Sequence, residues 1–133
     1  HYEIKKLNQI IKKKNFIFNL YKKEFENKKK IEIIYPDIQN VKSNHWLNVI
    51  RIKSKFNLNK KFMIFSKKNS IETRAVWKLL YLQKHLKKFN SSQCINSKNY
   101  IRNCFCIPSG PELNKNDIKK ISKKIRSFLK GIR

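Results

Sequence analysis

The sequence CFCIPSGPELNKNDIKKISKKIRSFLKG, residues 104–131, carries the clearest structural signals in the chain. Its first four residues predict a short buried strand, which Pro108 stops because proline donates no backbone hydrogen bond. A helix follows, since Asn114 and Asp117 are spaced as in a capping box and Gly131 stands where helices commonly end. Between these signals, apolar residues recur at helical spacing: Ile118, Ile121, Ile125, Phe128 and Leu129. The C-terminal part of the chain therefore predicts a strand followed by an amphipathic helix.

The rest of the chain alternates between helical patterns and short apolar runs. Apolar residues at three- and four-residue spacing from Ile4 to Phe25 predict one long helix of roughly 24 residues. An apolar stretch at 31–35 ends at the turn signal Pro36-Asp37. The other expected elements are a strand at 44–52, a helix at 57–66, a strand at 71–77, an irregular helix-compatible stretch at 78–90 and a short helix at 93–102. This order predicts an α/β or α+β layer fold, with the long N-terminal helix and further helices covering a small sheet.

The net charge invites a functional interpretation, but the residue usage argues against it. The chain has 33 Lys+Arg against 8 Asp+Glu, a formal net charge of +25, which would attract polyanions such as RNA or an acidic membrane surface. However, 28 of these cations are Lys and 5 are Arg, and Lys, Ile and Asn make up 63 of the 133 residues, the pattern of an AT-rich genome. Because Arg binds phosphate bidentately and Lys does not, the composition favours codon bias over nucleic-acid binding.

A small basic RNA-binding or ribosome-associated protein is the alternative function. This alternative rests on the net charge alone. Phe16, Phe18 and Tyr21 alternate with Lys and would offer rings on which bases could stack. Helical spacing favours a second interpretation of the same residues, as part of the hydrophobic core.

The chain offers no self-sufficient active site. It contains no glycine-rich phosphate loop, no H-E-x-x-H motif and no convincing pair of carboxylates. Cys94, Cys104 and Cys106 lack the spacing of a zinc site, so we expect thiols buried as small hydrophobes in a reducing cytosol. No apolar run approaches the roughly 18–20 residues of a membrane span. We therefore predict no catalytic residue and no metal site within this chain.

Three segments resemble a known family. Residues 43–48, SNHWLN, are similar to an SNYWLN strand; residues 72–79, ETRAVWKL, resemble the pattern xTRPxWxx; and residues 103–110 end in IPSG, similar to an LPSG turn. Their order and spacing match the C-terminal part of the DegT family of PLP-dependent nucleotide-sugar aminotransferases. The branch that makes 4-amino sugars for bacillosamine-, perosamine- or legionaminate-type pathways is the most similar.

The resemblance implies the small domain of a fold-type-I aminotransferase. Residues 1–29 then form the helix that joins two domains and residues 30–133 the small domain, whereas the N-terminal domain that carries the cofactor lysine is absent. The first residue, His1, agrees with a piece of a longer reading frame. The whole enzyme would use pyridoxal 5′-phosphate to move an amino group from an amino acid, with glutamate as the expected donor, to a nucleotide-linked keto-sugar for cell-surface polysaccharide or glycan biosynthesis. The family implies a cytoplasmic homodimer, and this segment alone would be inactive. A scaffold domain with no catalytic partner is a further alternative.

The family's motifs place four substrate-binding candidates in this chain. Arg74 would clamp an anionic group, and Trp77 would form an apolar or stacking wall. Tyr81 stands where many relatives have His, so it keeps a hydrogen-bonding group and lacks a titrating one. Asn44 is the fourth candidate. The alternatives are a surface ion pair for Arg74, plain core for Trp77, and a role in starting and packing the strand for Asn44 and Trp46.

One residue and one turn of the chain qualify these assignments. Ala75 replaces the family's usual Pro, which loosens the backbone that places Arg74. The Pro108-Ser109-Gly110-Pro111 stretch predicts a structural turn rather than a ligand loop.

Overall fold

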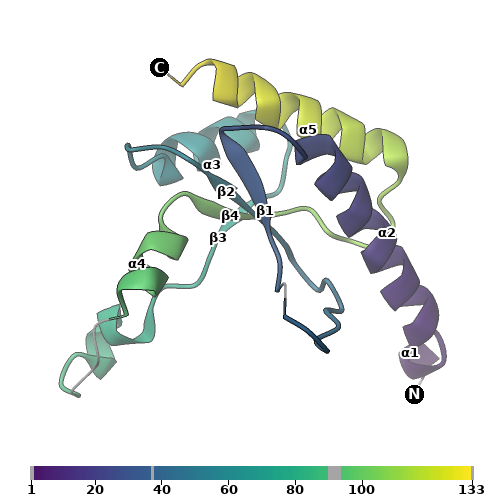
Figure 1. Cartoon of the computed structure of the whole chain (residues 1–133), viewed down its shortest axis with the longest axis horizontal. Coiled ribbons are helices and arrows are strands. Elements are labelled where there is room, and N and C mark those ends of the chain that lie inside the picture. The colour runs from purple at the N-terminus through teal and green to yellow at the C-terminus, as the bar shows by residue number, and fades with distance from the viewer. Residues whose placement is uncertain (1, 37, 90–93, 133) are drawn as a thin grey trace.

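A computed structural model describes residues 2–36, 38–89 and 94–132 as a four-stranded antiparallel sheet with helices packed against one face (Figure 1). The strand order is β1-β2-β4-β3. The elements in chain order are α1 (Tyr2–Lys5), α2 (Leu7–Phe25), β1 (Ile31–Ile34), β2 (Asn48–Ile52), α3 (Asn59–Lys68), β3 (Arg74–Ala75), the 3₁₀ turns η1 (Leu80–Leu82) and η2 (Lys84–Leu86), α4 (Ile95–Ile101), β4 (Cys104–Ile107) and α5 (Lys115–Lys130). This confirms the expected layer of helices on a small sheet.

The hydrophobic core lies between the sheet and the helices α2, α3 and α5. Side chains alternate along a strand, so the register Ile31↔Ile52 and Ile50↔Phe105 places these four residues on one face. The buried helix residues that meet them are Ile17, Tyr21, Phe25, Phe62, Ile118, Ile125 and Leu129. Of the three aromatic residues offered as a stacking platform, Phe18 and Tyr21 are buried and Phe16 is half-exposed. The core interpretation is therefore confirmed for Phe18 and Tyr21.

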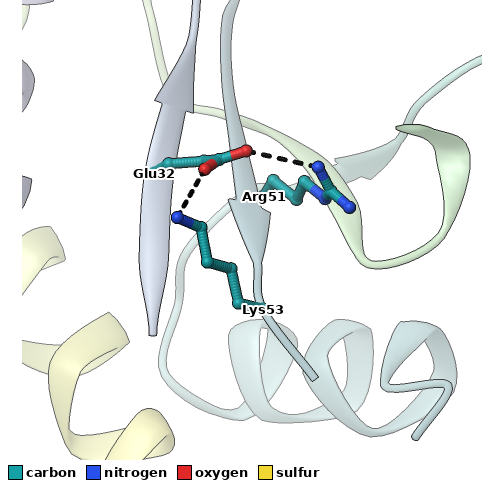
Figure 2. Close-up of polar contacts among 3 residues, drawn as sticks. All are labelled: Glu32, Arg51 and Lys53. Carbon is teal, nitrogen blue, oxygen red and sulfur yellow. Dashed lines mark hydrogen bonds and ion pairs between the residues drawn. The ribbon is translucent and has the colours of Figure 1, made fainter. Parts of the chain in front are cut away.

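The other face of the sheet carries charged and small side chains. Glu32 accepts from Lys53 at 2.8 Å and pairs with Arg51 on the neighbouring strand at 3.4 Å (Figure 2). These side chains are partly exposed, and ion pairs of this kind contribute less than about 1 kcal/mol each. The same register brings Cys106 and Arg74 together on this face. Arg74 and Cys106 therefore lie on the face of the sheet opposite the hydrophobic core.

Asn103 holds the loop between β2 and α3 against the start of β4. It has a left-handed backbone (φ 62°) and is 1 % exposed. Its Oδ1 accepts from the Leu58 amide at 2.7 Å, and its Nδ2 donates to the Phe56 carbonyl at 2.8 Å and the Ser54 carbonyl at 3.3 Å. Asn tolerates the left-handed region better than most residues do, so one side chain serves both the turn and the loop.

The C-terminal prediction is confirmed in detail. β4 spans the four predicted residues, and Asn114 caps α5 by accepting from the Asp117 amide at 3.1 Å, while the Asp117 carboxylate accepts from the Asn114 amide at 3.1 Å. Gly131 follows the helix as predicted, but its φ of −79° is right-handed, so the left-handed glycine cap is not formed.

Several predicted boundaries need correction. The strand expected at 44–52 begins only at Asn48, because the Asn44 side chain closes a turn onto the Trp46 amide at 3.0 Å and His45 has a φ of 48°. The strand expected at 71–77 shrinks to Arg74–Ala75, since only these residues pair with β4. The stretch 31–35 supplies an additional strand, β1.

The predicted helices differ from the observed ones mainly at their ends. The first helix is interrupted at Lys6, and the helix expected at 57–66 is Asn59–Lys68. The stretch 78–89 contains the two 3₁₀ turns η1 and η2 rather than a regular helix. The short helix predicted at 93–102 is observed as α4, Ile95–Ile101. Residues 90 and 93 of the two predicted stretches lie outside the described residues. Within the described ranges, no helix has the length and apolar character that a membrane crossing requires.

Candidate functional site

A cavity of about 520 Å³ lies where the three motif segments meet. One wall comes from the loop before β2, a second from β3 and the residues around it, and a third from the end of β4 and the turn that follows. The residues of these walls include Trp46, Leu47, Glu72, Arg74, Ala75, Trp77, Cys106, Ile107, Pro108 and Ser109. The three motif segments therefore form one site. A hydrogen bond from Ser109 to Trp46, which are 63 residues apart in the sequence, joins two of them.

Lys14 of α2 ties two of these walls together. Its ammonium donates to the Trp46 carbonyl at 3.1 Å and to the Ser109 carbonyl at 2.7 Å. The Ser109 hydroxyl also donates to the Trp46 carbonyl, at 3.2 Å. Neither Lys14 nor Ser109 was among the sequence candidates, and one lysine among 28 carries no signal of its own. The turn at 108–111 keeps its predicted structural role and also lines the cavity.

Two indole rings border the cavity. The centroids of Trp46 and Trp77 lie 6.5 Å apart with an interplanar angle of 36°, and both side chains are 66 % exposed. These are the only tryptophans in the sequence. Because Trp77 is two-thirds exposed, its interpretation as plain core is wrong. Both indoles line the cavity, and they remain open to solvent there.

Arg74 lies beside the indoles on β3, opposite Cys106 of β4. Its guanidinium donates to the Glu72 carboxylate at 2.8 Å, and both side chains are more than 70 % exposed. An ion pair so exposed to solvent is weak, so an anionic ligand can replace Glu72 at little cost. Arg74 can therefore pair with Glu72 and still be available to bind an anionic ligand. Ala75 pairs with Phe105, which keeps this short strand in the sheet without the family's proline.

The other two candidates lie outside the cavity lining. Asn44 uses its carbonyl oxygen to accept from the Trp46 amide, so its contact is with the local turn. Tyr81 belongs to η1. The ammonium of Lys98, a residue of α4, lies 5.8 Å from the centroid of the Tyr81 ring. The Tyr81 hydroxyl is shielded from solvent and has no hydrogen-bond partner among the described residues. The structure therefore brings Arg74 and Trp77 together, and it does not bring Asn44 or Tyr81 to them.

A family model covers almost the whole chain. The description of that model is DegT/DnrJ/EryC1/StrS aminotransferase family, and it matches residues 2–126. The chain belongs to this family. The expected resemblance is thereby confirmed.

Solved structures of aminotransferases share the fold of this family member. Aminotransferase TlmJ from Streptoalloteichus hindustanus superposes with a TM-score of 0.86 at 11 % identity, over 99 % of this chain and 35 % of that one. PseC from Helicobacter pylori, an aminotransferase involved in the biosynthesis of pseudoaminic acid, superposes with a TM-score of 0.83 at 20 % identity. The match covers 97 % of this chain and 35 % of PseC. A Streptococcus pneumoniae protein assigned as a sugar aminotransferase, in its PLP form, superposes with a TM-score of 0.85 at 15 % identity. The match covers 99 % of this chain and 34 % of that protein. The chain thus spans about a third of the length of these proteins.

The expectation of buried thiols holds for two of the three cysteines and is wrong for Cys94, which is exposed. Cys104 and Cys106 are buried, and burial raises the pKa of both thiols, to about 11 for Cys104; Arg74 partly offsets the effect for Cys106. Thiols with raised pKa values stay protonated near neutral pH, and a thiol is a far weaker nucleophile than a thiolate. In the described part of the chain, no group of His, Cys, Asp and Glu could hold a metal ion.

Stability should fall in alkaline solution because of Cys104. Above a pH of about 9 the unfolded thiol loses its proton whereas the buried one keeps it, so the free energy of unfolding decreases as the pH rises towards about 11. Urea unfolding at pH values between about 8 and about 10 measures this slope. The variant Cys104→Ala should show a shallower slope, and an identical slope in both proteins would contradict the assignment.

Proposed function

We propose that this chain is the small domain of an aminotransferase that moves an amino group from an amino acid, glutamate in the proposal, to a keto carbon of a nucleotide-linked sugar. The observation that carries the proposal is the convergence of all three family motifs on one cavity. Residues 1–29 would then lead to a larger domain and residues 30–133 would form the small domain. The product would serve cell-surface polysaccharide or glycan biosynthesis.

The residues that line this cavity do not fit the cofactor, pyridoxal 5′-phosphate. A fold-type-I aminotransferase needs a lysine whose amine can reach the cofactor, and the one lysine among the cavity residues, Lys14, donates to two backbone carbonyls. The one carboxylate among them, Glu72, is paired with Arg74. We therefore assign the cofactor, and with it the chemical step, to a part of the protein outside this chain.

The contribution of this chain is to bind and orient the substrate. Arg74 would exchange Glu72 for a phosphate or carboxylate of the substrate and hold it with two parallel hydrogen bonds. The indoles of Trp46 and Trp77 would cover a planar or apolar part of the same molecule, and stacking on one ring is worth about 1–3 kcal/mol per nucleobase. Lys14 would keep the Trp46 loop and the Ser109 turn at a fixed separation.

Exposed apolar side chains support a larger assembly. Beyond β3, five large apolar residues are exposed: Trp77, Leu80, Leu82, Phe89 and Ile95. In Figure 1 the segment with η1, η2 and α4 extends away from the sheet and the helical layer. Exposed apolar groups along a segment that projects from the rest of the fold are typical of an interface. We propose that this segment contacts the larger domain or, in a homodimer, the second subunit.

The reading frame that contains this chain tests the proposal. We expect it to encode a preceding domain with a cofactor lysine, and the purified product, supplied with pyridoxal 5′-phosphate and glutamate, to convert a UDP-linked 4-keto sugar into the amino sugar. Mass spectrometry of the nucleotide sugar and release of 2-oxoglutarate measure the conversion. A reading frame without such a domain, or a loaded protein that forms neither product from any nucleotide-linked keto-sugar, would contradict it.

A further inference from the structure

A second, strongly cationic groove lies between α2 and α5. The two helices are in contact and run across the same side of the molecule (Figure 1). The cavity between them measures about 580 Å³ and shares no lining residue with the candidate site. The charged residues of its lining are Lys23, Glu24, Lys28, Lys115, Lys119 and Arg126. The groove is therefore a separate feature, independent of the proposed function.

The single carboxylate in this lining is already neutralised. Arg126 donates to the Glu24 carboxylate at 2.5 Å and to the Glu24 backbone carbonyl at 3.2 Å. Asp117, at the start of α5, accepts from the Asn114 amide within the helix cap and does not line the groove. Four lysines of the lining take part in none of the ion pairs among the described residues: Lys23, Lys28, Lys115 and Lys119.

These four lysines are exposed cations that line one cavity. Lys115 and Lys119 lie one helical turn apart on α5, a spacing at which two like charges repel each other. Lys23 faces the same cavity from α2. An anion with several charges would relieve this repulsion, whereas a single small anion could contact only part of the cluster.

We propose that the groove between α2 and α5 binds a chain of phosphate groups. Phosphate oxygens are the anions that lysine ammonium groups bind as point charges, and several linked phosphates match four cations around one cavity. The remaining lining, Leu20 and Ile118, is aliphatic, so the cavity has no aromatic ring on which a nucleobase could stack. Recognition therefore rests on the phosphate chain rather than on a base.

Sodium tripolyphosphate is the probe that tests this inference, with titration by calorimetry at a salt concentration of about 50 mM. We expect one saturable site and at least about a tenfold loss of affinity in the double variant K23Q/K119Q, because two of its four unpaired cations are gone. The control, K60Q/K67Q on α3, removes the same charge from an exposed face and should weaken binding by less than about twofold. Circular dichroism verifies that both variants fold.

Three outcomes would overturn the inference. Equal losses in K23Q/K119Q and K60Q/K67Q would mean that only the net charge attracts the anion. Tighter binding of a single-stranded RNA than of tripolyphosphate, unaffected by K23Q/K119Q, would place polyanion binding elsewhere on the molecule. Orthophosphate serves as a further arm: affinity equal to that of tripolyphosphate would contradict recognition of a phosphate chain.

Discussion

Replacing Asn103 with alanine is expected to lower the free energy of unfolding by about 3–4 kcal/mol. The side chain makes three hydrogen bonds to the backbone of the loop between β2 and α3, and its removal leaves the buried Leu58 amide without its acceptor. Each buried group left unpaired costs about 1–3 kcal/mol. Alanine also fits a φ of 62° less well than asparagine does, by roughly 1–2 kcal/mol in the left-handed region.

Two further variants separate the causes of this loss. Asn103→Gly relieves the backbone but still lacks the hydrogen bonds, so it should recover only the conformational part. Asn57→Ala removes an exposed side chain whose carbonyl oxygen accepts only from the Asn59 amide, and it should cost less than about 1 kcal/mol. Urea unfolding followed by circular dichroism measures all three. Losses of similar size for Asn103→Ala and Asn57→Ala would show that Asn103 is not the clamp of this loop.

In the proposed aminotransferase, Arg74→Ala should lower kcat/KM by about 10- to 100-fold, which corresponds to about 1.4–2.7 kcal/mol. The guanidinium is exposed, pairs only weakly with Glu72 and stands beside two indoles on the cavity wall. Its removal therefore takes away an anion contact while it leaves the core untouched. The assay is the steady-state rate of amino transfer with the nucleotide-linked sugar as the varied substrate.

Matched variants define what this kinetic result means. Lys78→Ala removes one charge from an exposed neighbour that does not line the cavity, so its kcat/KM should stay within about twofold of the wild type. Arg74→Lys keeps the charge and loses the planar fork, so an intermediate value is expected. If Arg74→Ala behaves as Lys78→Ala does, Arg74 is a surface ion-pair residue only.

Sequence signals predicted the elements whose causes are local. The strand at Cys104–Ile107 and the capped helix after Asn114 were predicted from residues within a few positions of each other. Boundaries failed where the competing interaction was a side chain bonded to its own loop, as in the turn that Asn44 makes before β2. The strand around Arg74 was overestimated because pairing with a distant strand, rather than propensity, sets its length.

The candidate site was only half predictable for the same reason. Arg74 and Trp77 were found through the family motif. Lys14 was not, because its role depends on a carbonyl 95 residues away, and nothing distinguishes it from the other lysines before the chain folds. Trp46 was interpreted as a packing residue from its place in a predicted strand, whereas the turn at His45 leaves the ring exposed beside Trp77.

The intrinsic fluorescence of this chain gives the most direct test of the candidate site, because both of its tryptophans line the cavity. Titration with a UDP-linked sugar into the millimolar range should change the emission saturably. Arg74→Ala should abolish that response, and Lys78→Ala should preserve it. An emission that stays constant throughout the titration, or a response that is the same in Arg74→Ala and the wild type, would contradict a substrate-binding role for this cavity.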